Sequence, residues 1–223
     1  MADTLLPTLP SDPTLDEMRL ALGAAIPAQA MFDGWGDAAL EAAAKGLGLD
    51  PGHARLAFPD GAIGMVDAWY ASIDARLAAA FPPERIAAMK IRDRIGALIL
   101  ARLDLVRPTK QAARTALALL ARHPVAATKL GWRAADTMWR IAGDTATDLN
   151  HYSKRLTLSA VYGATLVVWL DDESAEETDT RGFLDRRLAD VMRIEKLKAQ
   201  FRPDPERQFS VTRLLGRLRY PAS

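Results

Sequence analysis

The chain has 223 residues, 49% of them hydrophobic and 26% charged, a globular composition that argues against a wholly disordered protein. Lys and Arg number 29 and Asp and Glu 28, so the net charge of +1 gives no whole-protein field that would attract nucleic acid or a membrane. Cysteine is absent, which excludes disulfides, thiolate metal sites and thiol nucleophiles, and the three histidines form no metal-binding motif such as HExxH.

The chain begins with spaced prolines and no basic or strongly apolar stretch, so we expect residues 1–13 to be a disordered leader without a targeting signal. A helix should begin at Thr14, where Thr-Leu-Asp-Glu forms a capping box, and continue to about Pro27. Beyond it, alanine-rich periodic segments alternate with Pro and Gly, and strand-like alternation is nearly absent. This pattern predicts an all-α fold, with further helices over residues 37–46, 51–58, 61–81, 83–105, 108–123, 131–144, 148–170 and 179–200.

The longest apolar run covers residues 156–170 and is shorter than the roughly 20 residues that a transmembrane helix needs. Charged pairs lie at both of its ends, and hydroxyl-bearing side chains interrupt it. We therefore interpret the run as a buried helix of a soluble, cytoplasmic protein.

Residues 37–61 contain a helix, a tight glycine turn and a short helix that closes on Phe-Pro, which is typical of a helix-turn-helix. With the preceding helix, this arrangement resembles the N-terminal domain of TetR-type regulators. Between residues 33 and 67, however, six acidic residues accompany only Lys45 and Arg55, a net charge of −4 where a DNA reader must neutralise phosphates. The predicted recognition helix offers little beyond His53 and Arg55, so we expect a structural head, with DNA binding as the less favoured alternative.

Several motifs follow one another between residues 132 and 200: WR-x-AD-x-MWR-x-AGD, D-x-N-x-Y-x-KR, VYGAT, LDDES and FLDRR. Together with GW-x-DAALEAAAKGLGL and AFPDG in the head, they resemble the accessory lipid-binding family of ubiquinone (coenzyme Q) biosynthesis. The resemblance implies a TetR-like homodimer that is not an enzyme and needs no cofactor or metal. Such a protein binds an isoprenoid quinone intermediate and presents it to the demethoxyubiquinone hydroxylase at the membrane surface, with DNA binding unlikely. It would be cytoplasmic and peripherally associated with the bacterial inner membrane.

The implied organisation places a helix-turn-helix-like head over residues 14–60 and a larger helical lipid-binding and dimerisation domain over residues 61–201. A basic amphipathic tail, expected to contain a short C-terminal helix, covers residues 202–223. Two positions depart from the family pattern: His151 stands where Trp is usual, and Arg181 stands where an aromatic residue is usual. Both departures affect the region expected to face the partner.

The helix that begins near residue 148 carries a candidate docking surface. Tyr and Arg are common in interface hot spots, and four residues at i, i+3, i+7 and i+10 share one face there: Tyr152, Arg155, Ser159 and Tyr162. Given the resemblance, we expect this face to bind the hydroxylase. Bonding within the bundle or a homodimer interface fits the same pattern, and His151 fits a helix-end histidine better than a catalytic one.

A candidate lipid site lies on the preceding helix, where Trp132 and Trp139 share a face with the small Ala135 between them. Small residues beside large aromatic ones leave room for a groove, and lipid pockets are largely apolar. The same groove would be lined further by Met65, Trp69, Leu98 and Ile99. An aromatic stripe at helical spacing also describes an ordinary core, so both interpretations stay open.

The segment from residue 171 to 179 is a compact acidic turn. Its spacing lacks the pattern of a calcium-binding loop, and it has neither a nucleophile nor a histidine nearby. We therefore expect a solvated turn that caps the neighbouring helices, with Asp179 and Thr180 as N-caps.

Residues 193–219 carry eight basic residues against three acidic ones. After the prolines at 203 and 205, apolar residues repeat at helical spacing while arginines lie away from them, as in helices that bind anionic membranes. A helix folded back onto the body is the alternative. The residues expected to contact the membrane are Arg213, Leu214, Leu215, Arg217 and Leu218.

Two other functions compete with the accessory role. One is a TetR-like transcriptional repressor with a lipid or quinone inducer, which the acidic charge of the head disfavours. The other is an independent enzyme, for which the sequence contains no recognisable nucleophile, metal or cofactor motif.

Overall fold

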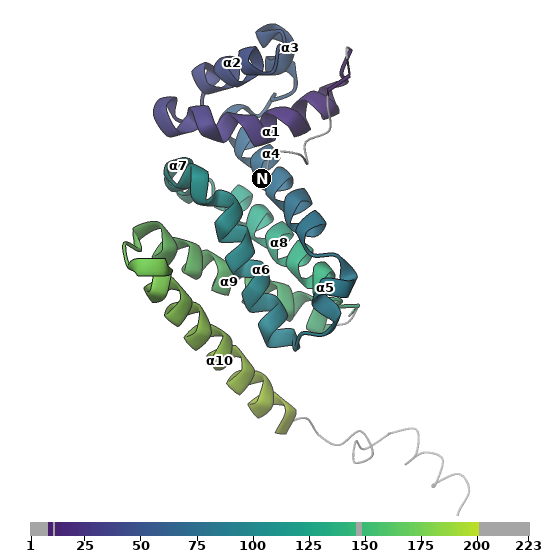
Figure 1. Cartoon of the computed structure of the whole chain (residues 1–223), viewed down its shortest axis with the longest axis vertical. Helices are drawn as coiled ribbons and strands as arrows, with labels where there is room; N and C mark the ends of the chain where they lie inside the picture. The colour runs from purple at the N-terminus through teal and green to yellow at the C-terminus, as the bar shows by residue number, and fades with distance from the viewer. Residues whose placement is uncertain (1–8, 11, 146–148, 201–223) are drawn as a thin grey trace, which may run out of the picture.

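The computed structural model describes residues 9–10, 12–145 and 149–200. These residues form α-helices and two short 3-10 helices and contain no strand, which confirms the predicted all-α fold. The elements are α1 (Leu15–Asp33), α2 (Asp37–Gly46), α3 (Pro51–Leu56), α4 (Gly61–Ala80), α5 (Pro83–Ala87), α6 (Ile91–Val106), η1 (Arg107–Thr109), α7 (Lys110–Ala121), α8 (Pro124–Ile141), α9 (Leu149–Asp171), η2 (Ala175–Glu177) and α10 (Thr178–Gln200). Figure 1 shows α1–α3 as a head at one end, α4 running from the head into the body, and α10 along one side of the body with its far end away from the head.

The first helix begins as predicted but ends later. Thr14 Oγ1 accepts a hydrogen bond from the Glu17 amide at 3.3 Å, and Glu17 Oε2 accepts one from the Thr14 amide at 2.8 Å, so the capping box is present. The helix continues through Pro27, which lacks an amide hydrogen and ordinarily ends or kinks a helix. It persists because residues on both sides of the proline, including Ile26 and Ala30, are buried in the head.

The helix predicted over residues 83–105 is divided into α5 and α6. Lys90 adopts an extended conformation, with φ −68° and ψ 151°, and separates the two helices. The side chain of Arg94 bridges the break, since its Nε donates to the Met89 carbonyl at 2.8 Å and its Nη1 donates to the Ala142 carbonyl at 2.8 Å. The carbonyl of Ala142 belongs to the far end of α8, so the break is stabilised by a tertiary contact that local periodicity does not contain.

Two apolar cores meet along α4. The head core contains Leu22 of α1 together with Met65 and Ala68 of α4, and the body core contains Trp69 and Ile73 of the same helix. Because one helix contributes to both cores, the head packs on the body instead of hanging from a linker.

The predicted division into a head over residues 14–60 and a lipid-binding domain over residues 61–201 stays a prediction. Most of the expected leader and all of the expected tail, residues 202–223, lie outside the described residues. The membrane-binding residues predicted in that tail lie outside them as well.

The helix interpreted as buried, over residues 156–170, is buried on one face only. Within α9, Leu158 and Leu166 are buried, whereas Leu156 is 58% exposed and Val167 is 55% exposed. In the part of the chain that the structure describes, α9 included, no helix has the length and apolar character needed to cross a membrane.

Charged residues tie the head to the body. Arg19 of α1 pairs with Asp67 of α4 at 3.0 Å, and Arg133 of α8 reaches both Asp67 at 2.8 Å and Asp74 at 3.2 Å. The guanidinium of Arg102 in α6 is fully buried and also pairs with Asp74. Three helices are thus attached to two carboxylates of α4, which sets the orientation of the head.

The packing of α1 on α4 requires a glycine. A Cβ atom on Gly23 would lie 2.6 Å from the carbonyl oxygen of Ala68, far closer than real Cβ contacts. Both residues are buried in the head, so the helices cannot separate without opening its core.

We expect Gly23→Ala to lower the free energy of unfolding by about 1–3 kcal/mol, the usual effect of overpacking a core. Urea denaturation monitored by circular dichroism measures the change. Gly46→Ala is the matched control, because a Cβ there meets nothing within 4 Å, and it should leave stability almost unchanged. Equal stability of the two variants would contradict the close approach of α1 and α4.

Candidate functional site

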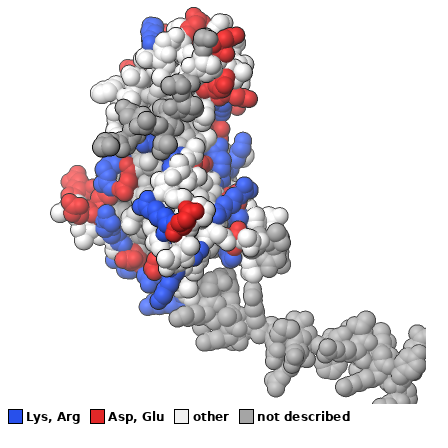
Figure 2. Space-filling model, turned by 45° about the vertical axis from the view of Figure 1, so that its right-hand side comes forward, with Lys and Arg blue, Asp and Glu red and all other residues white. Residues whose placement is uncertain are grey.

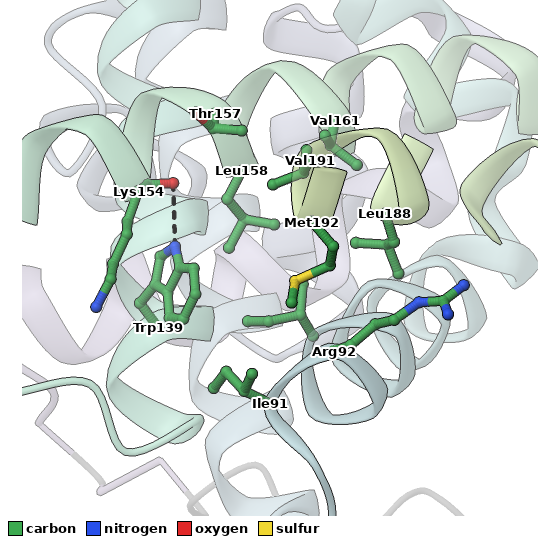
Figure 3. Close-up of a pocket in the computed structure, with 11 residues that line it drawn as sticks. Ile91, Arg92, Trp139, Lys154, Thr157, Leu158, Val161, Leu188, Val191 and Met192 are labelled. Carbon is green, nitrogen blue, oxygen red and sulfur yellow. Dashed lines mark hydrogen bonds between the residues drawn. The ribbon is translucent and has the colours of Figure 1, made fainter. Parts of the chain in front are cut away.

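A cavity of about 130 Å³ lies between α6, α8, α9 and α10, and its walls are almost wholly hydrocarbon (Figure 3). The apolar side chains that form it come from segments far apart in the sequence and include Ile95, Trp139, Leu158, Val161, Leu188 and Met192. Arg92 and Lys154 lie at its edge, and Figure 3 shows their charged ends pointing away from the cavity. The cavity is therefore suited to a hydrocarbon segment.

The indole of Trp139 is held in place as one wall. Its Nε1 donates to the carbonyl of Lys154 at 3.1 Å, so the polar edge of the ring is satisfied by the backbone of α9. The ammonium of Lys154 lies 5.3 Å from the ring centroid and pairs with Asp144 at 2.6 Å. The ring thus presents a hydrocarbon face to the cavity.

Of the seven residues predicted to line a lipid site, Trp139 lines this cavity. The other six are packed elsewhere: Trp69, Leu98, Ile99 and Ala135 in the body core, Met65 in the head core, and Trp132 beside Tyr152 near the surface. The seven residues therefore do not line one common groove: Trp139 borders the cavity, Trp132 borders a shallow depression, and the others belong to two separate cores.

The walls that α6 and α10 contribute to the cavity were not predicted from the sequence. Ile91 and Ile95 come from α6, and Leu188, Val191 and Met192 come from α10. The local sequence feature that could have indicated these walls was the helical spacing of apolar residues within the otherwise charged α10. Whether the side chains of α6 and α10 meet depends on how α10 packs on the body, and no single segment of the sequence shows that packing.

The charged residues of the longest motifs pair with one another between α8 and α9. Arg155 is 2% exposed, and its Nε lies 2.6 Å from Asp136 Oδ1 while its Nη1 lies 3.2 Å from Asp144 Oδ2. Lys154 adds the second cation on Asp144. These motif residues therefore fasten α9 to α8 and position Trp139.

The predicted docking face is only partly exposed. Tyr152 is 58% exposed, but Arg155 and Tyr162 are buried, so these two residues fit the alternative of bonding within the bundle and do not belong to an exposed docking face. A helix turns by about 100° per residue, so position 155 is rotated by about 60° and position 162 by about 80° from position 152, and both point inward when 152 faces outward. Ser159 is half-buried against α8, where a Cβ on Gly131 would come within 2.5 Å of its hydroxyl.

An exposed aromatic and apolar surface, the α8–α9 patch, surrounds Tyr152. The Tyr152 ring lies 5.9 Å from that of Trp132 and 5.2 Å from that of His151. Leu156 is 58% exposed on the next turn, and Val125, which shares a shallow depression with Trp132, is 83% exposed. Partly exposed Trp and Tyr side chains are frequent binding hot spots.

The two departures from the family pattern are far apart in the structure. His151 belongs to the α8–α9 patch at the start of α9. Arg181 lies on α10 beyond the other end of α9, and its Nε donates to the Glu176 carbonyl at 2.9 Å. Only His151 can therefore alter the surface around Tyr152.

We expect Arg155→Ala to lower the free energy of unfolding by about 3 kcal/mol or more, because two largely buried carboxylates lose their cation. Tyr152→Ala, an exposed change one turn away, should cost about 1 kcal/mol or less. Guanidinium denaturation of both variants separates a stabilising residue from a surface residue. Similar stability of the two variants would show that the Arg155 pairs contribute little.

The acidic turn caps α10 through Asp172. Its Oδ1 accepts from the amide and hydroxyl of Ser174 at 2.8 and 2.6 Å, and its Oδ2 accepts from the amide and hydroxyl of Thr180 at 2.8 and 2.5 Å. The helix begins at Thr178, so Asp179 and Thr180 lie within its first turn and are not its N-caps. Among the described residues no cluster of His, Asp and Glu could hold a metal ion.

The hydrogen bonds from Ser174 and Thr180 hold the pKa of Asp172 well below its ordinary value of 3.8. A carboxyl with a lowered pKa in the folded state contributes stability that is fully present above about pH 4 and is lost as the pH falls through its folded pKa. We therefore expect Asp172→Asn to lower Tm at neutral pH, with the difference from the parent shrinking below about pH 4.

Thermal unfolding between about pH 7 and pH 2 checks this dependence. Glu173→Gln, an exposed change in the same turn, is the control and should show no comparable effect. A loss of Tm in Asp172→Asn that did not vary with pH would contradict the role of the charge.

Acidic side chains gather on the head, at the top of Figure 2. The basic residues of α3 are directed toward them: Arg55 pairs with Glu41, its Nε lies 3.8 Å from Asp37 Oδ2, and His53 Nδ1 lies 4.0 Å from Asp50 Oδ1. The side chains of Arg55 and His53 thus face carboxylates of the head itself.

Comparison with known proteins confirms the resemblance predicted from the motifs. The COQ9 family matches residues 125–195, the segment that carries α8, α9 and most of α10. Ubiquinone biosynthesis protein COQ9, mitochondrial, from Homo sapiens is 42% identical over 59 residues, which are 26% of this chain and 19% of that protein. Ubiquinone biosynthesis protein COQ9-B, mitochondrial, from Xenopus laevis is 32% identical over 102 residues, which are 46% of this chain and 34% of that protein. The similarity thus spans about a fifth to a third of these relatives.

The fold is TetR-like. A crystal structure of the TetR transcriptional regulator from Nitrosomonas europaea ATCC 19718 superposes with a TM-score of 0.62 and 23% sequence identity, over 78% of this chain and 98% of that one. This match confirms the predicted fold class and concerns the fold alone.

Proposed function

We propose that this protein acts in ubiquinone biosynthesis as an accessory protein that binds the hydrocarbon part of an isoprenoid quinone intermediate and presents its ring to the demethoxyubiquinone hydroxylase. The chemistry would belong to the hydroxylase, and we expect no catalytic activity from this chain. The apolar cavity carries the proposal, since most of its lining residues lie in the segment similar to the COQ9 family.

The character of the walls favours binding of the isoprenoid tail over the quinone ring. Burying a carbonyl oxygen without a hydrogen-bond partner costs about 1–3 kcal/mol. Each CH₂ group moved from water into an apolar site contributes about 0.8 kcal/mol in the favourable direction. The tail should therefore enter the cavity first and leave the ring outside, where a partner enzyme could reach it.

Two uncovered surfaces fit the expected protein partners. The α8–α9 patch around Tyr152 is the surface that we assign to the hydroxylase. Farther along α9, the exposed Val167 follows the small residues Ala160, Gly163 and Ala164, which allow close approach of another helix. We assign that stretch to a second copy of this chain, in line with the expected homodimer.

The membrane contact rests on the sequence of residues 202–223, whose basic and apolar pattern suits an anionic bilayer surface. With that contact, the protein would act at the cytoplasmic face of a bacterial inner membrane. A lipid carrier placed there would shorten the transfer of an isoprenoid chain through water.

A TetR-like repressor with a lipid or quinone inducer is the alternative that the fold suggests. The pairing of Arg55 with Glu41 in the acidic head disfavours it, because a DNA reader needs free cations toward the phosphates. A mobility shift of upstream DNA at physiological salt would favour the repressor.

We expect Val191→Trp to reduce the isoprenoid recovered with the purified protein several-fold, because the larger side chain would fill a cavity of about 130 Å³. Organic extraction of the full-length protein followed by mass spectrometry measures the bound lipid per chain. Val125→Trp is the matched control, since Val125 is 83% exposed and lies outside the cavity. Equal lipid content in the two variants would overturn the assignment of the cavity, and a parent protein without lipid would point to a scaffold or regulator.

A further inference from the structure

The cavity is small for the ligand that we assign to it. Pockets that hold drug-sized molecules usually measure about 300–1,000 Å³, whereas this cavity has about 130 Å³. An isoprenoid chain of several units can enter only if one wall moves. Leu188, Val191 and Met192, three of its lining residues, come from α10.

Among the described residues, the ion pair that joins α10 to the other walls of the cavity is an exposed one, between Arg92 of α6 and Asp185 at 3.7 Å. The buried pairs of Arg155 join α9 to α8, and Arg94 joins the start of α6 to the end of α8. By contrast, α10 places Leu184 and Leu188 in the body core, and farther along, Met192 and Ile194 are 37% and 52% exposed. Figure 1 shows the helix running along the side of the body, with its far end beyond it.

The start of α10 is fixed by a strained turn. Glu176 and Glu177 have φ values of 52° and 54°, the left-handed conformation that residues other than glycine rarely adopt. The side chain of Glu177 is 13% exposed and accepts hydrogen bonds from Trp169 Nε1 at 2.8 Å and from Arg107 Nη2 at 3.1 Å. The carboxylate thereby links the turn to α9 and to η1, and these bonds hold the backbone in a conformation that it would otherwise leave.

We propose that Glu177 is a positioning residue whose bonds to Arg107 and Trp169 hold α10 across the cavity, and that α10 pivots at this turn to admit a ligand. The pivot follows from the geometry of the turn and from the exposure of Met192 and Ile194 farther along α10. Its use for lipid entry rests on the function proposed above. Weakening the Glu177 bonds should therefore raise the population in which α10 lies away from the body.

The experiment uses the absence of cysteine from the chain. Ile194→Cys on α10 and Lys129→Cys on α8 add two exposed attachment sites for nitroxide labels in the full-length protein. Pulsed electron paramagnetic resonance then measures the distance distribution between α10 and the body. The test variant is Glu177→Gln, which keeps the size of the side chain and an acceptor for Trp169 but removes the charge toward Arg107.

We expect one main distance in the parent and a second, displaced population in Glu177→Gln. Loss of one charge-assisted hydrogen bond corresponds to a rise of about tenfold or more in that population. The apolar fluorophore diphenylhexatriene should enter the variant faster by a similar factor. Glu173→Gln, which makes the same charge change at an exposed position in the same turn, should match the parent in both measurements.

Arg107→Gln tests the same link from its other side and covers the case in which Glu177→Gln fails to fold. It should displace α10 to a similar extent, and the double variant should add little to either change. Unchanged distance distributions in Glu177→Gln and Arg107→Gln would overturn the pivot, even if diphenylhexatriene binds to every protein. Displaced α10 in a protein that never binds the fluorophore or an isoprenoid would support the pivot and count against the proposed lipid function.

Discussion

The guanidinium of Arg155 joins the two helices on which both proposed sites depend. It lies inside the bundle between Asp136 of α8 and Asp144 at the end of that helix. By setting the register of α9 on α8, it brings Lys154 over Trp139 and so shapes the cavity wall. A buried ion pair of this kind adds little net stability over an apolar contact, but losing one partner is costly. The ion pairs of Arg155 therefore specify the packing of α9 on α8 more than they contribute net stability.

A second set of ion pairs fixes the orientation of the head on the body. The two aspartates of α4 receive arginines from α1, α6 and α8, and the buried Arg102 also lies 5.6 Å from the ring of Tyr70 and 5.3 Å from that of Tyr162. Burial disfavours the charge of Arg102, but Tyr162 and Asp74 outweigh that effect and raise its pKa above the ordinary value. With α4 shared by both cores, the head behaves as part of the body. This rigidity fits a structural head better than one that adjusts to DNA.

Firm packing of α4, α8 and α9 leaves α10 as the variable element. Its residues Leu188, Val191 and Met192 cover the cavity, and its near end is fixed by Asp172 and Glu177. A wall attached at one end suits a protein that must both shelter and release an apolar chain. The same arrangement explains why the cavity is small when the wall lies against the body.

Local patterns in the sequence were sufficient for the helices that have caps, prolines and glycines at their ends. The capping box at Thr14 and the proline-led start of α3 act within a few residues and appear where the pattern predicts them, whereas α8 begins at Pro124, seven residues before the predicted position. The prediction failed at Pro27 and at Lys90, where burial in the head core and the reach of Arg94 override local preference. The spacing on α9 likewise predicted that four residues share a face. It did not predict that Arg155 and Tyr162 on that face would be buried while Tyr152 stays exposed.

The sequence by itself determined the all-α fold, the acidic head and the resemblance carried by the motifs between residues 132 and 200, because caps, charge and ordered motifs are properties of the chain alone. Only the tertiary structure decided that Arg155 and Tyr162 are buried and that Tyr152 stays exposed. It also decided that a cavity forms beside Trp139 instead of within the predicted stripe. Whether apolar side chains meet or leave a space depends on how helices pack on one another, and here α6, α8, α9 and α10 bring the lining residues together from separate segments of the chain.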